Sequence, residues 1–279
     1  MANMDLTRIR SNIQALSILH NLRGVNNNLA KHQLRVGTGK RINSAGDDPA
    51  GLTISTKLQS RYRVMGQLYD NIDQANNMLA VAEGALLSVN DILTTMNEKI
   101  IMSASDSIGT TERQAISQQL VQLVSEINDI ADDTEFNGVQ VLGSTTSFTF
   151  QTAEDGQTVW TTQSFDTTTL GMTNFTALTD TDTIDSTNYQ SFYSEVEVAM
   201  ETVSNALTAL GSLSNRMATK SDIITVTRNA TESAYNRIAN ADMAQEQMEL
   251  TKYQLLQQTS LVMLAQANMS PQSLLTLFQ

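Results

Sequence analysis

Few residues in this 279-residue chain have the types and spacing that chemistry requires. The two histidines, His20 and His32, are accompanied by no HExxH pattern and no carboxylate at metal-ligand spacing, which argues against a zinc site. The absence of cysteine excludes disulfides, thiolate metal sites and cysteine nucleophiles. We therefore expect no bound metal ion.

Two further patterns resemble parts of enzyme sites. The run GTGK at 37–40 lacks the first glycine of a phosphate-binding loop, and Arg41 stands where a serine or threonine would follow. The adjacent carboxylates Asp47 and Asp48 fall in a turn, where no enclosed site separates their pKa values as catalysis would require. Neither GxSxG nor GxGxxG occurs. We expect no enzyme activity and no cofactor.

These acidic residues belong to the stretch RINSAGDDPAGLTIS at 41–55, whose composition is typical of a chain leaving one helix and entering another. Asp48 is suited to cap a helix that begins at Pro49. The turn must therefore join two helices.

Both ends of the chain predict helices with a narrow apolar stripe. In the first segment apolar residues recur every three or four positions, at Leu6, Ile9, Ile13, Leu16, Leu19, Leu22, Val25 and Leu29. In the last segment a heptad repeat runs through Ala234, Ala241, Met248, Leu255, Val262 and Met269, with Ala244, Thr251 and Ala265 between them. The simplest arrangement pairs the two ends as antiparallel helices along these stripes.

Between the ends we expect helices from 50 to about 106 and from 111 to 131, then two hairpins, then a helix from 189 to about 268 with a joint at 240–244. Asn137-Gly138 and Asp155-Gly156 are the predicted hairpin turns. Residues 163–188 are rich in Thr, Asp and Ser, which predicts a surface excursion. The predicted fold class is mainly α: an elongated helical rod or coiled-coil bundle with a small β-hairpin region and paired N- and C-terminal helices.

Charge is divided unevenly along the chain. Residues 1–41 carry seven Lys or Arg and one acid, whereas 114–215 carry fourteen acids and no Lys or Arg. The basic segment contains no aromatic residue for stacking or interfacial anchoring, so we expect no nucleic-acid partner and no membrane insertion. The N-terminus has no classical signal-peptide pattern, and no window reaches about 18 continuous apolar residues.

Three segments together resemble bacterial flagellins. RINSAGDDPAGLTIS resembles the family's hallmark turn. AEGALLSVNDIL (82–93) with DDTEFNGVQVL (132–142) resembles its N-terminal rod, and LAQANMSPQSLLTLF (264–278) resembles its C-terminus. The resemblance covers the chain in order and implies a short flagellin without large outer domains. The implied function is a secreted, structural subunit that polymerises into the extracellular flagellar filament for swimming motility.

The resemblance also implies an organisation. Residues 1–42 and 238–279 would form an inner region, and 43–190 with 191–237 an outer rod. Self-assembly contacts would involve the terminal stripes and the turn, at Leu6, Ile9, Ile13, Leu16, Arg41, Asn43, Asp47, Asp48, Met248, Leu255, Val262 and Met269. The implied partners are further copies of the chain, an export chaperone, the filament cap and hook-junction proteins. Export would proceed unfolded through the flagellar type III apparatus. The chaperone would mask a C-terminal apolar run, namely Leu255, Leu256, Leu261, Val262 and Leu264.

Two alternative functions fit the sequence less well, and three positions differ from the family pattern. A hook-filament junction protein would share the terminal helices and the turn, although the C-terminal sequence favours flagellin. A peptidase in the variable region is disfavoured because that region is short and lacks histidine. Flagellins that activate the vertebrate innate receptor present an arginine, a leucine and a glutamate on the rod, and ungapped counting places these at Thr95, Lys99 and Gln119. All three differ here, which predicts weak activation.

Overall fold

The computed structural model describes residues 12–179 and 182–276, with side chains as far as residue 269. It is mainly α-helical, with two small hairpins, as predicted. The described residues divide into two compact units. Unit 1 contains the residues up to Tyr62 and those from Asn229 onward, and unit 2 contains Arg63–Arg228.

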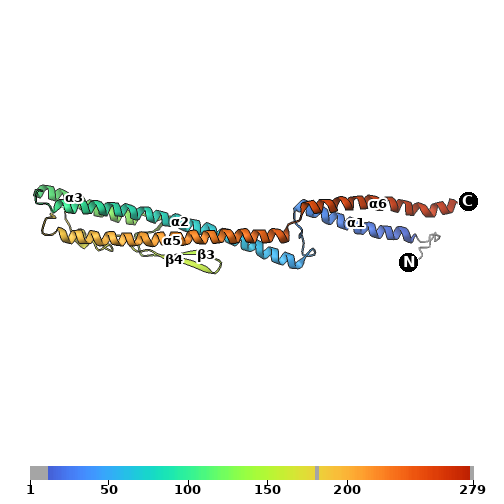
Figure 1. The fold of residues 1–279 in the computed structure, drawn as a ribbon, viewed down its shortest axis with the longest axis horizontal. Helices are drawn as coiled ribbons and strands as arrows, with labels where there is room; N and C mark the ends of the chain where they lie inside the picture. The colour runs from blue at the N-terminus through green and yellow to red at the C-terminus, as the bar shows by residue number, and fades with distance from the viewer. Residues whose placement is uncertain (1–11, 180–181, 277–279) are drawn as a thin grey trace. The chain divides into compact units, whose positions relative to one another are not determined.

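Unit 1 is built on α1 (Ile13–Thr38) and α6 (Met243–Thr276), together with the start of α2 (Pro49–Ser103) and the end of α5 (Tyr189–Ala239). Helices α1 and α6 lie side by side (Figure 1), which confirms the predicted pairing of the terminal helices. The Asn12 side chain accepts a hydrogen bond from the Ala15 amide at the start of α1. Gly39 ends the helix with φ 68°, a left-handed conformation that favours glycine.

Unit 2 contains the remainder of α2 and α5 with α3 (Thr110–Asp133), the short α4 (Thr173–Thr176) and two hairpins. Its core is formed by apolar side chains that recur every three or four residues along the long helices. Fully buried examples are Leu86, Val89, Leu93, Met96 and Ile100 on α2, Leu120 and Ile127 on α3, and Val196, Ala199 and Val203 on α5.

The first hairpin pairs β1 (Glu135–Phe136) with β2 (Val139–Gln140) through Asn137 and Gly138, as predicted. Both turn residues have positive φ, 54° and 77°, which Asn and Gly tolerate best.

The second hairpin pairs β3 (Ser147–Ala153) with β4 (Gly156–Thr161). Its predicted Asp155-Gly156 turn is wrong by one residue, because Gly156 pairs with Ala153 and the turn consists of residues 154 and 155. A register irregularity between Gln151 and Ala153 accompanies this shift.

The segment 163–188 is not the surface excursion that its composition predicted. Five of its apolar side chains are buried in the core of unit 2, namely Phe165, Leu170, Met172, Phe175 and Ile184. Its polar residues satisfy backbone groups locally, as where Asp185 Oδ1 accepts hydrogen bonds from the amides of Thr187 and Asn188. Asn128 Oδ1 of α3 also accepts from the amide and hydroxyl of Thr167. The apolar residues follow neither a helical nor a strand period, so periodicity alone did not identify them as core.

Among the described residues, α2 contains a stretch whose length and mean hydropathy, 1.2, would suffice to cross a membrane. The apolar side of this helix supplies much of the core of unit 2. About a third of the stretch is buried within the chain, and a core helix of a helical bundle can have this same composition.

Candidate assembly interface

The contact between α1 and α6 is partly polar. Asn12 Nδ2 donates to the Ala267 carbonyl at 2.6 Å, and Gln257 Nε2 donates to Asn26 Oδ1 at 2.8 Å. The order of these contacts makes the helices antiparallel. Leu22 and Leu29 are the buried apolar residues of α1 in this contact.

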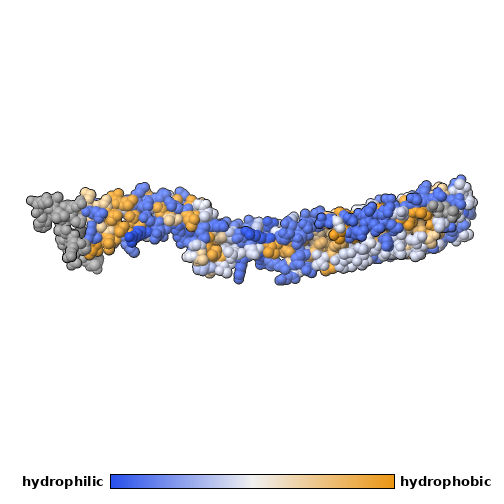
Figure 2. All heavy atoms as spheres, turned by 180° about the vertical axis from the view of Figure 1, so that it is seen from behind, coloured by the Kyte–Doolittle hydropathy of each residue, from blue (hydrophilic) through white to orange (hydrophobic). Residues whose placement is uncertain are grey.

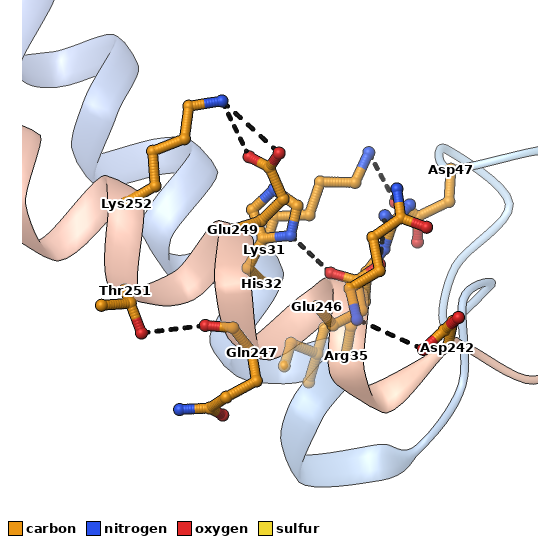
Figure 3. A network of polar contacts seen from close by, with 12 residues as sticks. Lys31, His32, Arg35, Asp47, Asp242, Glu246, Gln247, Glu249, Thr251 and Lys252 are labelled. Atoms are coloured by element: carbon orange, nitrogen blue, oxygen red, sulfur yellow. Dashed lines mark hydrogen bonds and ion pairs between the residues drawn. The ribbon is translucent and has the colours of Figure 1, made fainter.

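A cluster of mostly buried charged groups lies at the end of the pair nearest the turn (Figure 3). The Glu246 carboxylate accepts a hydrogen bond from His32 Nδ1 at 2.5 Å and one from Arg35 Nη1 at 3.1 Å. The His32 ring stacks on Tyr253 with a centroid distance of 5.2 Å. Because two α1 side chains, His32 and Arg35, converge on one α6 carboxylate, this cluster fixes the register of the two helices.

The heptad predicted on α6 does not face α1. Met248, Leu255, Val262 and Met269 are 67%, 60%, 66% and 65% exposed. The prediction that this stripe packs against the N-terminal helix is therefore wrong. The side facing α1 is a second heptad, formed by the buried or half-buried Glu246, Leu250, Tyr253, Gln257, Ser260, Leu264 and Ala267. It is less apolar, but Glu246, Tyr253 and Gln257 have partners on α1.

The first half of the N-terminal stripe is exposed as well. Ile13 and Leu16 are 55% and 71% exposed, so the stripe contacts α6 only in its later part, at Leu22 and Leu29. Leu6 and Ile9 lie outside the described residues. Figure 2 shows apolar side chains gathered on the visible surface of unit 1. Exposed apolar faces of this extent mark interaction surfaces.

The segment that follows α1 and the segment that precedes α6 lie beside each other. Lys40 and Asn240 form an isolated antiparallel bridge, in which the Arg41 amide donates to the Ala239 carbonyl at 2.8 Å. The Arg41 guanidinium donates through Nε and Nη2 to the Ile238 carbonyl. The segment that leaves α1 is thereby tied to the segment that enters α6.

Asp47 and Asp48, the two acidic residues of the turn, accept hydrogen bonds from different groups. Asp48 Oδ1 accepts from the Gly51 amide at 2.8 Å, which confirms its predicted role as the cap of α2. Asp47 instead closes the turn, because its Oδ2 accepts from the amides of Asn43 and Ser44. Its Oδ1 pairs with Lys31 Nζ of α1 at 3.2 Å.

The pKa of Asp47 reflects these contacts. Burial of the carboxyl acts to raise the pKa, but hydrogen bonds from Lys31, Asn43 and Ser44 outweigh it and hold the pKa below its ordinary value of 3.8. Asn43 contributes a second contact, in which its Nδ2 donates to the Lys40 carbonyl at 2.9 Å. The turn thus depends on a charged Asp47.

The three receptor-equivalent positions lie in unit 2 and keep some exposure. Thr95 and Lys99 are one turn apart on α2 and half-buried, and Gln119 is exposed on α3. The Thr95 hydroxyl donates to the Asp91 carbonyl of its own helix.

The sequence prediction missed the Glu246 cluster and the α6 side that it belongs to. The available signal was the spacing of Glu246, Leu250, Tyr253, Gln257, Ser260, Leu264 and Ala267, which alternates between four and three residues. Because several of these residues are polar, a search for apolar periodicity favoured the other face.

Comparison with known proteins identifies the family. Residues 9–147 match the bacterial flagellin N-terminal helical region, and residues 193–278 match the bacterial flagellin C-terminal helical region. The chain is 34% identical to a flagellin of Halalkalibacterium halodurans over 277 residues, which are 97% of this chain and 99% of that protein. It is 29% identical to a flagellin of Listeria monocytogenes over 283 residues, covering 96% of this chain and 98% of that one.

A solved structure supports the fold. A putative flagellar hook-associated protein from Vibrio parahaemolyticus has a TM-score of 0.62 at 12% identity, covering 70% of this chain and all of that one. At this identity the likeness concerns the fold alone, so it does not favour the hook-junction alternative. The two family models and the relatives in sequence span nearly the whole chain: it belongs to the bacterial flagellins, the structural subunits that polymerise into the flagellar filament used for motility.

Proposed function

We propose that neighbouring subunits meet through the exposed heptad of α6, formed by Met248, Leu255, Val262 and Met269, and through the N-terminal stripe, formed by Leu6, Ile9, Ile13 and Leu16. One observation carries the proposal: the mixed polar and apolar side of α6 is covered by α1, whereas the apolar heptad on the opposite side is left exposed. A helix with this pattern is stable when it is covered on both sides. In a polymer, further copies of the chain supply the second cover.

The test is to place a charge in the heptad and measure polymerisation. Leu255→Asp puts a carboxylate into a surface that the filament would bury, so the variant should remain monomeric under conditions in which the natural chain forms filaments. Gln254→Asp adds the same charge at the adjacent, exposed position outside the heptad and serves as the matched control. Filaments of normal length from Leu255→Asp would refute the assignment.

The turn is proposed as a second assembly element, formed by Arg41, Asn43, Asp47 and Asp48. Its intramolecular bonds hold it in one conformation beside the α1–α6 pair, and a preformed surface loses less entropy on binding. In this scheme, residues 1–42 and 238–279 are the inner region of the filament, with 43–190 and 191–237 outside them. Cryo-electron microscopy of filaments would test these boundaries and the contacts of the turn.

The route to the filament follows from the same family. We infer that the chain is secreted unfolded through the flagellar type III apparatus and delivered past the hook-junction proteins to the filament cap. The absence of cysteine is compatible with such a route, because no disulfide can form and hold the chain folded before export. An export chaperone would cover the exposed apolar residues of α6, among them Leu255, Leu256, Leu261 and Val262. Co-purification of the chaperone with natural chain but not with a Leu255→Asp/Leu261→Asp variant would support this site.

A further inference from the structure

Nine of the thirteen methionines form two contrasting groups. Five are buried in the core of unit 2, namely Met65, Met78, Met96, Met172 and Met217, each no more than 5% exposed. On α6 four are open to solvent, namely Met243, Met248, Met263 and Met269, each at least 45% exposed. Since the chain has no cysteine, the exposed thioethers are its most readily oxidised side chains.

Two of the exposed methionines lie at the two ends of the α6 heptad. Met248 and Met269 are three heptads apart, on the side of the helix that α1 does not cover. Met248 also lines a shallow, mainly apolar groove with Ala244, Thr251 and Leu255. A polar atom on either sulfur would enter the surface that assembly buries.

We propose that Met248 and Met269 are oxidation sites through which a hydroperoxide reversibly blocks polymerisation of the free subunit. The inference rests on the proposed role of the α6 heptad. In the reaction the peroxide O–O bond breaks and one oxygen bonds to the thioether sulfur. The sulfur loses two electrons to become a sulfoxide, and hydrogen peroxide is reduced to water.

The sulfoxide changes the interface in two ways. It replaces a flexible apolar side chain by a dipolar, chiral one, and its oxygen requires a hydrogen-bond donor that the lining of an apolar seam does not supply. Each sulfoxide should therefore raise the subunit concentration needed for polymerisation by roughly tenfold or more. Reduction by methionine sulfoxide reductase restores the thioether and with it assembly.

The experiment treats full-length monomer and preformed filament with hydrogen peroxide and measures sulfoxide at each methionine by peptide mass spectrometry. In the monomer Met248 and Met269 should react at a rate comparable to Met102, which is 52% exposed in unit 2, and the five core methionines should not. In the filament Met248 and Met269 should be protected. Equal oxidation of these two sites in both states would refute the proposed assembly face.

Polymerisation of the oxidised monomer then tests the inference itself. The double variant Met248→Leu/Met269→Leu keeps a similar volume and should polymerise normally after peroxide treatment, while a Met102→Leu control should behave like the natural chain. Treatment of the oxidised natural chain with methionine sulfoxide reductase should restore assembly whether or not the double variant forms filaments. The inference is overturned if subunits carrying both sulfoxides polymerise at an unchanged concentration, if the double variant remains peroxide-sensitive, or if the reductase restores nothing.

Discussion

Gly51 lies so close to the Asp48 carboxylate that a Cβ atom on residue 51 would stand 2.3 Å from Asp48 Oδ2. The same Cβ would stand 2.7 Å from Cδ1 of Ile42, which is buried. The close approach allows the Gly51 amide to donate to the capping carboxylate. A larger residue here would force the ends of both side chains to shift, although position 51 lies in a helix.

We predict that Gly51→Ala destabilises unit 1, because the methyl group must displace both the capping carboxylate of Asp48 and Cδ1 of Ile42. Loss of the cap costs about 1 kcal/mol, and overpacking adds about 1 to 3 kcal/mol. Gly66→Ala, also in α2, is the control, since a Cβ there meets nothing within 4 Å. It should stabilise the helix by about 0.5 to 1 kcal/mol. The midpoint of thermal unfolding, followed by circular dichroism, should fall for Gly51→Ala and rise for Gly66→Ala. Equal shifts of the two midpoints would contradict the packing argument.

The turn should also depend on pH through Asp47. Its pKa in the folded chain is below the ordinary value of 3.8, so as pH falls the unfolded chain binds a proton at this group first. The stabilisation is complete above the ordinary pKa and is lost as pH falls through the lower, folded pKa. Asp47→Asn removes the titrating group. The difference in unfolding free energy between the natural chain and this variant should be present at pH 7 and disappear in acid, whereas a constant difference would exclude the mechanism.

Glu246 should stabilise the α1–α6 pair more than Glu249 of the same helix does. Glu246→Gln weakens the hydrogen bonds from His32 and Arg35, and charged hydrogen bonds of this kind are worth about 1.5 to 3 kcal/mol when buried. Glu249→Gln is the control, because its pair with Lys252 is more exposed and worth about 0 to 1 kcal/mol. Hydrogen exchange of the α1 and α6 amides should accelerate for the first variant only.

The polar segment 163–188 supplies a test of the core. Phe175 is 2% exposed, and its ring meets that of Phe192 edge-on at a centroid distance of 5.0 Å. Phe175→Ala should cost about 3 to 5 kcal/mol. Val159→Ala, on the exposed side of β4, should cost little. Unfolding of unit 2 can be followed by fluorescence of Trp160, the single tryptophan, and equal midpoints for the two variants would show that the segment is not part of the core.

Local chemistry explains which features the sequence could predict. Asp48, Pro49 and the Asn137-Gly138 pair act within a few residues, so composition identified the start of α2 and the first hairpin. The pairing of α1 with α6 was also predicted, but from an α6 stripe that does not face α1. Which side of α6 meets α1 was not predictable, because it depends on polar matches such as Asn26 with Gln257. These matches join residues far apart in the sequence and have no periodic apolar signature.

The receptor-equivalent positions give the last prediction. By the ungapped count, Thr95 takes the place of the expected arginine and supplies no cation, and its hydroxyl already donates within α2. Lys99 places a charge where an apolar contact is expected, and the exposed Gln119 on α3 lacks the negative charge. Each lost anchor can cost about 1 to 4 kcal/mol of binding, without strict additivity.

Purified monomer should therefore activate a reporter cell line weakly or not at all. The triple variant Thr95→Arg/Lys99→Leu/Gln119→Glu should raise the response, because it restores one cation, one apolar contact and one anion on surface positions of α2 and α3. A Gln254→Asp variant, altered only on α6, serves as the control for a general effect of substitution. Strong activation by the natural chain would show that the ungapped placement of these positions is wrong, and an unchanged response of the triple variant would show that other residues of the surface prevent recognition.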